Sequence, residues 1–298
     1  MRAEAYTFNG KDDLNIQVYK WLPDNNEVKA ILQITHGSIE HAMRYRHFGE
    51  WLTEKGIGVY IHDQRGHGKT AGKVENVAFL TERDNGWELL IEEINCVTKT
   101  IKKEYPDKKI FLLGHSMGSF EVRDYASKFG RDIDGLLVCG TVPNRLKDKI
   151  QFKFARKYLK KQIKKYGKKY RSQKVHNMVY KELLLSRDKS IEEAYKADPY
   201  CGNLCTIDYI NQMIIGVTRI MTSECFDNTP NDLPILIFSG EKDNVGGAKV
   251  SSVYDTYKKA GIKDVSLKIY EGAYHEVLNE INKEEVYEDI YQWINTHL

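Results

Sequence analysis

The chain has 298 residues, of which 41% are hydrophobic and 29% charged, and its formal net charge is +3. This length suits one large α/β domain or two average domains, and the composition excludes a disordered chain, a collagen and a disulfide-stapled scaffold. The first ten residues lack the apolar core of a signal peptide, and no apolar run approaches the roughly 18 residues that cross a bilayer. Because five cysteines, an odd number, favour free thiols in a reducing compartment, we expect a cytoplasmic protein.

Short β-rich runs alternate with longer helical patterns along most of the chain. This alternation predicts an α/β fold, with a mostly parallel sheet flanked by helices. Apolar residues at three- and four-residue steps from Trp87 to Ile101 predict a helix that ends before Pro106. Further helices are expected over 116–130 and 281–298. The strand candidates are residues 16–21, 30–35, 58–62, 109–113, 135–139, 235–239 and 265–270.

The alternation stops after Cys139 and resumes at Leu233. We therefore divide the chain into a core, residues 1–140 and 233–298, and a helical insertion, residues 141–232. Within the insertion, residues 145–174 carry fourteen Lys and Arg against the single acid Asp148, a net charge of +13 that leaves −10 for the rest of the chain. One amphipathic helix is expected there, with a shared apolar face made of Ile150, Phe154, Tyr158, Leu159, Ile163 and Tyr166.

The segment Gly114-His115-Ser116-Met117-Gly118 fits the pattern GxSxG, and it lies between a predicted strand and a predicted helix. A serine on such a tight turn has a strained backbone, and the small residues two positions away let the chain pass without a clash. The turn presents the serine hydroxyl at the carboxyl end of the sheet. The start of the helix places the N–H of Met117 where an oxyanion would form. Ser116 is therefore a candidate nucleophile.

A serine nucleophile needs a base, and the order of the chain in this arrangement places the base after an acid that itself follows the serine. Only His176, His275 and His297 follow Ser116. His176 precedes every acid near a later strand, and His297 is the penultimate residue, where fraying would spoil the geometry. His275 is therefore the predicted base.

The predicted acid is Asp243, four residues past the strand 235–239, at the end of the strand where catalytic groups of open sheets collect. Its predicted role is to hold the imidazole tautomer and stabilise the imidazolium. Glu241 is the alternative. Asp227 and Asp232 precede the strand and would lie at its other end.

A second oxyanion donor is expected in the loop after the strand 30–35, which reads His36-Gly37-Ser38. We assign the N–H of Ser38 as this donor, with Met117 as the other, and interpret His36 as structural. The later segment from Asp63 to Thr70 contains GKT, but a phosphate-binding loop needs glycine at position 63. Asp63 and Arg65 are instead expected to form a buried or semi-buried ion pair that fixes the loop after the strand 58–62.

No cofactor and no metal are expected. The patterns GxGxxG and HExxH are absent, and Cys201 and Cys205 lack the second pair or nearby histidine that would complete a tetrahedral site. The segment 198–202 has no explanation from the sequence.

Five ordered blocks together resemble an α/β-hydrolase of the monoacylglycerol lipase and lysophospholipase group, which is also classed with serine aminopeptidase-like hydrolases. The resemblance implies the triad Ser116, Asp243 and His275, the oxyanion donors Ser38 and Met117, and a helical cap. Two departures bear on the acyl pocket: Ile39 stands where the family often has glycine, and Gly246-Gly247 where a proline often follows the acid. The blocks are HGSIEHAMRY (36–45), DQRGHGKT (63–70), LLGHSMGSF (112–120), GEKDNV (240–245) and HEVLNE (275–280).

We expect two-step hydrolysis of a monoacyl lipid ester, with activity that falls below pH about 6.5 as His275 gains a proton. A small soluble ester or a peptide is the alternative substrate. A non-catalytic ligand sensor is disfavoured because all three triad members are present. The basic insertion either contacts an anionic membrane or is a solvated helix face. Nucleic acid is not an expected partner, since no binding motif accompanies the charge, and the oligomeric state stays open.

Overall fold

The computed structural model describes residues 1–24, 27–181 and 183–298 and contains one eight-stranded sheet. The strands follow the order β1-β2-β4-β3-β5-β6-β7-β8; β2 pairs antiparallel with both β1 and β4, and all other pairs are parallel. The expectation of a mostly parallel sheet is confirmed. The strands are β1 (Arg2–Asn9), β2 (Asn15–Leu22), β3 (Ala30–Thr35), β4 (Ile57–His62), β5 (Lys109–His115), β6 (Gly135–Cys139), β7 (Ile235–Gly240) and β8 (Val265–Tyr270).

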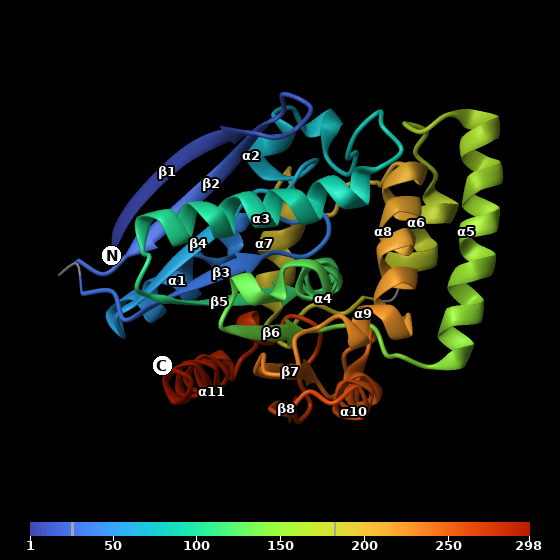
Figure 1. Cartoon of the computed structure of the whole chain (residues 1–298). Coiled ribbons are helices and arrows are strands. Elements are labelled where there is room, and N and C mark those ends of the chain that lie inside the picture. Colours follow the sequence, from blue (N-terminus) through green and yellow to red (C-terminus); the bar gives the residue numbers. More distant parts are fainter. Residues whose placement is uncertain (25–26, 182) are drawn as a thin grey trace.

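Helices cover both faces of the sheet (Figure 1). On one face, α1 (Arg46–Glu54) and α11 (Lys283–Thr296) bury their apolar sides against the strands. On the other face lie α3 (Gly86–Glu104), α4 (Met117–Phe129) and α10 (Ser251–Lys259). Burial on both faces explains why the central strands read as continuous apolar runs in the sequence.

All seven predicted strands are present, within two residues of their expected ends, but the sequence analysis missed β1 (Arg2–Asn9). This strand lies at the edge of the sheet, and most of its side chains are exposed. An edge strand with little buried surface carries no hydrophobic pattern that periodicity can detect.

Among the described residues between β6 and β7 there are five helices: α5 (Leu146–Tyr166), α6 (Gln173–Tyr180), α7 (Lys189–Ala197), α8 (Ile207–Ile220) and α9 (Ser223–Asp227). Among them α8 is the inner helix, in contact with α3, α4, α5 and α6 (Figure 1). Gly216 permits this approach, because a Cβ there would lie 2.1 Å from the ring of Trp87. The inner helix therefore belongs to the main hydrophobic core.

The outer helix α5 has apolar residues on two sides, unlike the single apolar face predicted from the sequence. Phe152, Ala155, Tyr158, Leu159 and Ile163 point inward and pack on the core. A second group points outward, with exposures of 73% for Leu146, 50% for Ile150 and 68% for Phe154. The predicted single face was wrong because a helix with apolar residues on two sides cannot be oriented without knowing its neighbours. Within the described residues, no helix combines the length and apolar character that crossing a membrane requires.

The predicted ion pair between Asp63 and Arg65 is also wrong. Asp63 accepts hydrogen bonds from the backbone N–H groups of Ala42 and Lys69, 2.9 and 2.8 Å away. Arg65 points elsewhere and pairs with Glu93 of α3 and with Asp12 in the turn after β1. Asp63 thus binds backbone N–H groups and Arg65 binds carboxylates, and both sets of contacts fix the conformation of the loop.

Candidate active site

Ser116 lies on the sharp turn between β5 and α4. Its backbone has φ 53° and ψ −119°, a conformation rare for a residue other than glycine. The turn has no room for larger residues at positions 114 and 118: a Cβ on Gly114 would lie 2.2 Å from the carbonyl oxygen of Gly118, and a Cβ on Gly118 would lie 2.2 Å from that of Thr35. Strain at such a turn is characteristic of functional sites.

Asp243 and His275 form a buried pair at the carboxyl ends of β7 and β8. Asp243 Oδ1 lies 2.9 Å from His275 Nδ1 and accepts a second hydrogen bond from the N–H of Val245 at 2.8 Å. Ser239 Oγ donates to the other carboxylate oxygen at 3.0 Å. His275 Nε2 is buried and has no hydrogen-bond partner among the described residues. His275 Nε2 is therefore available to accept a proton.

The attraction between the two side chains shifts both pKa values in the direction that favours the charged form of each. Burial alone would raise the pKa of Asp243, but the charge and hydrogen bond of His275 outweigh it, and the pKa lies below its ordinary value. Burial would lower the pKa of His275, but the carboxylate of Asp243 outweighs that effect and raises it. The rival carboxyl, Glu241, accepts from the N–H of Gly272 on the surface and does not contact the imidazole.

Ser38 approaches Ser116 through the loop after β3. Gly37 makes this possible, because a Cβ there would lie 3.2 Å from Ser116 Cβ and 2.5 Å from a carboxylate oxygen of Glu40. Met117 is the first residue of α4, so its N–H points out of the helix start. The structure thus brings the loop of Ser38 close to Ser116, which the N–H of Met117 directly follows.

The hydroxyl of Ser38 takes part in a cluster that the sequence analysis missed. It makes hydrogen bonds with the hydroxyls of Tyr180 on α6 and Tyr209 on α8, at 2.5 and 2.6 Å. Tyr209 also bonds to His67 Nε2 at 3.0 Å and reaches the sulfur of Met117 at 3.2 Å. These contacts join segments as much as 171 residues apart, so no sequence pattern could reveal them.

A buried ion-pair cluster next to His275 was also not predicted from the sequence. Arg44 donates to both carboxylate oxygens of Glu276, each at 2.7 Å, and to Glu40, also at 2.7 Å. Burial would raise the pKa of Glu40, but the charge of Arg44 outweighs it and holds that pKa well below its usual range. Since Glu276 follows His275 directly, the cluster fixes the backbone next to the predicted base. The only signal of this cluster in the sequence is the spacing of Glu40 and Arg44, which corresponds to about one helical turn.

The histidines of the neighbouring loops are neutral core residues. His36 Nε2 accepts from the N–H of Gln64 at 3.1 Å, so Nδ1 carries the proton and donates to Gly37 O at 2.7 Å. Burial lowers the pKa of His36 to about 4 and that of His67 to about 3. This geometry gives His36 the structural role that the sequence predicted.

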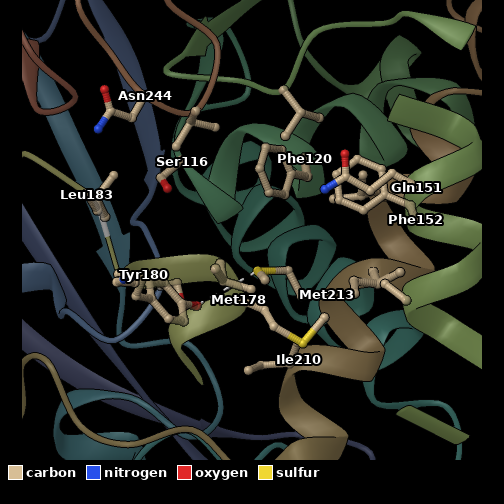
Figure 2. A pocket seen from close by; sticks show the side chains of 18 of the residues that line it. Ser116, Phe120, Gln151, Phe152, Met178, Tyr180, Leu183, Ile210, Met213 and Asn244 are labelled. Carbon is tan, nitrogen blue, oxygen red and sulfur yellow. Dashed lines mark hydrogen bonds between the residues drawn. The ribbon is translucent and has the colours of Figure 1, made fainter. Parts of the chain in front are cut away.

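A cavity of about 490 Å³ opens at Ser116, within the range of ordinary ligand pockets. Figure 2 shows Ser116 facing this space, which is bordered by Phe120 of α4, Tyr180 of α6 and Met213 of α8. Phe152 of α5 lies farther from the serine. The lining is largely apolar and comes mainly from the helices between β6 and β7, so the cavity suits a hydrocarbon chain.

Three potential metal ligands lie close together outside this cavity. The ligand atoms of His41, Asp198 and Cys201 fall within 4.8 Å of one another, a proximity that the sequence did not reveal. His41 Nε2 makes a 2.8 Å hydrogen bond with Asp198, and burial raises the pKa of the Cys201 thiol, which disfavours the thiolate that a metal binds. The arrangement explains the segment 198–202 as a contact between the helical insertion and the loop after β3.

Comparisons with known proteins agree with this geometry. The profile of the family described as serine aminopeptidase, S33, matches residues 26–282. The chain is similar to a monoacylglycerol lipase of Mycolicibacterium smegmatis, with 28% identity over 98% of this chain and 97% of the relative, and to a human monoglyceride lipase, with 26% identity over 92% and 85%. A crystal structure of a thermostable carboxyl esterase from Bacillus coagulans superposes with a TM-score of 0.86, 26% identity and 99% coverage of both chains. The chain therefore belongs to the serine aminopeptidase, S33, family of α/β-hydrolases.

Proposed function

We propose that this protein is a serine ester hydrolase that acts on monoacyl lipids through an acyl-enzyme intermediate. The observation that carries the proposal is the meeting of a strained Ser116 turn, a buried Asp243–His275 pair and an apolar cavity at one end of the sheet. The similarity to monoacylglycerol lipases supports the lipid substrate.

Ser116 Oγ attacks the acyl carbon while His275 Nε2 takes the hydroxyl proton. Asp243 accepts from His275 Nδ1 and stabilises the imidazolium that forms. The N–H groups of Ser38 and Met117 bind the oxyanion, and His275 then gives its proton to the leaving alcohol. In the second step His275 removes a proton from water, which attacks the acyl carbon, and His275 then gives that proton to Ser116 Oγ as the ester bond breaks and the fatty acid leaves.

Residues 141–232 act as the cap of this active site, and 1–140 with 233–298 form the catalytic core. Helices α5, α6 and α8 contribute most of the apolar lining, while Ser116, Ser38 and Val245 come from the core. The cap therefore selects the acyl chain, and the core performs the chemistry.

The experiment that tests this function is hydrolysis of a series of monoacyl esters from acetyl to palmitoyl by the wild type and Ser116→Ala. We expect a maximum at medium or long chains and loss of the rate in the variant. A maximum at acetyl or butyryl would make the protein a short-chain carboxylesterase. A rate that survives in Ser116→Ala would refute the assignment of the nucleophile.

The outer face of α5 docks on an anionic membrane and brings the lipid to the cavity. Leu146, Ile150 and Phe154 recur every four residues and are exposed, and lysines surround them. Five free cysteines favour a cytoplasmic location, where this face meets the anionic leaflet.

Sedimentation with phosphatidylglycerol vesicles tests the docking. We expect binding in about 0.05 M salt, weaker binding in about 0.5 M salt, and loss of binding in Leu146→Ser/Phe154→Ser. Ile281→Ser is the matched control, since Ile281 is 65% exposed on the core and away from α5. Equal binding by both variants, or no binding by the wild type in low salt, would refute membrane docking.

A further inference from the structure

Ile39 has an unusual backbone conformation next to the proposed oxyanion donor. Its φ is +49°, in the left-handed region that suits glycine, although its side chain is branched at Cβ. The side chain is buried, with 3% exposure. A conformation of this kind persists only when surrounding contacts impose it. These contacts come from the helical insertion.

The carbonyl oxygen of Ile39 accepts two hydrogen bonds from that insertion. Tyr195 of α7 donates through its hydroxyl at 3.1 Å, and Gly202 donates through its N–H at 3.0 Å. Gly202 has φ +67°, which favours glycine, and a Cβ there would lie 3.1 Å from the ring of Tyr195, so a larger residue would press on the tyrosine. Both donors thus converge on one carbonyl.

The ring of Tyr195 is also held in place. The guanidinium of Arg44 lies 4.9 Å from the centre of its ring, and Arg44 is fixed by Glu276. The hydrogen bond from His41 to Asp198 ties the same insertion segment to the loop after β3. The hydroxyl of Tyr195 is therefore a rigid donor.

We propose that Tyr195 is a positioning residue of the esterase site, whose hydrogen bond holds Ile39 in the left-handed conformation that aims the N–H of Ser38 at the oxyanion. The inference rests on the proposed function, since it needs Ser38 as an oxyanion donor. The carbonyl of Ile39 is held by the insertion, so a change in φ of Ile39 rotates the rigid Ser38–Ile39 peptide unit and moves Ser38, with its N–H, relative to the site. The cap then serves the chemistry as well as the choice of substrate.

Substitution of Ile39 separates this role from a merely structural one. Glycine adopts a positive φ without strain, so the loop of Ile39→Gly keeps its geometry without the tyrosine hydroxyl. We expect Tyr195→Phe to lower kcat about tenfold, a fraction of the loss of a whole oxyanion donor, with KM changed less than about twofold. In the Ile39→Gly background the same substitution lowers kcat less than about twofold. Ile39→Asn provides a second background, because asparagine also tolerates this region.

Steady-state kinetics on one monoacyl ester, with and without Tyr195→Phe in the wild-type, Ile39→Gly and Ile39→Asn backgrounds, provide the test. Tyr200→Phe is the matched control, because the Tyr200 hydroxyl donates to Gly72 O at 2.9 Å from the same insertion segment without reaching Ile39. It should leave kcat within about twofold of the wild type. An equal kcat loss from Tyr195→Phe in every background, an effect on KM alone, or no effect would overturn the positioning role. Failure of the proposed function is seen separately, as a wild-type rate that persists in Ser116→Ala.

Discussion

Asp243→Asn isolates the charge of the proposed triad carboxylate from its hydrogen bonds. In the wild type Oδ1 faces the N–H of Val245 and Nδ1 of His275, while Oδ2 faces the hydroxyl of Ser239. The asparagine oxygen must take the Oδ1 position, because the Val245 N–H requires an acceptor. The amide group then faces Ser239, whose hydroxyl can accept. His275 therefore keeps its proton on Nδ1, and the substitution removes the negative charge without changing the tautomer.

The cost follows from the charge that develops on His275. Two unit charges about 4 Å apart at an effective dielectric constant of about 20 interact by about 4 kcal/mol. Because about 1.4 kcal/mol corresponds to a factor of ten in rate, kcat/KM should fall about a thousandfold. The pKa of His275, which Asp243 raises, should fall as well. With neutral His275 as the proposed base, wild-type activity should be lost as the pH falls through the raised pKa, and the variant should keep its residual activity to lower pH.

Measurement of kcat/KM from pH about 5 to about 9 on a monoacyl ester checks both effects. Glu241→Gln is the control, since Glu241 contacts the surface backbone of Gly272 instead of the imidazole, and it should stay within about twofold of the wild type. A loss below about tenfold in Asp243→Asn, or an unchanged pH midpoint, would refute the role assigned to the carboxylate.

Three further substitutions test the packing around the site. Gly118→Ala should abolish activity and destabilise the fold, because its Cβ would lie 2.2 Å from the carbonyl oxygen of Thr35; retained activity would contradict the tight turn. Arg65→Met should lower the free energy of unfolding by about 3–5 kcal/mol in urea titrations, because it leaves Glu93 buried without its partner, and Arg65→Met/Glu93→Leu should recover part of that loss. Glu121→Gln should raise Tm at pH about 8 and much less at pH about 4. Burial raises the pKa of this carboxyl well above its usual value, so its stability cost begins above the unfolded pKa of about 4.3 and grows as the pH rises. A Tm gain that does not depend on pH would show that ionisation is not the cause.

Local constraints made the sheet and the serine turn predictable. The glycines two residues before and after Ser116 are required by contacts within a few ångströms, so they appear as a short motif. The strand ends before Asp243 and His275 are visible as apolar runs, and their order along the chain narrows the choice of acid and base. The roles of these side chains were inferred in the same way and stay predictions.

Contacts between distant segments could not be predicted. The hydroxyls of Tyr180 and Tyr209 reach Ser38 from helices whose orientation depends on packing against the core. The two apolar sides of α5 look like one wide face until the neighbours of the helix are known. Arg65 has several acids within a plausible reach, and only the fold selects Glu93 over Asp63. Local sequence thus determines the turn and strand ends, while tertiary packing determines the arrangement of the helical insertion and the buried charges.

The most direct test of the central claim is intact-protein mass spectrometry after reaction with a fluorophosphonate. We expect one adduct per chain, located on Ser116, and a much slower reaction in His275→Ala because the proposed base that activates the hydroxyl is gone. An unlabelled wild-type protein, an adduct on another residue, or a labelling rate unaffected by His275→Ala would contradict the claim that Ser116 is an activated nucleophile.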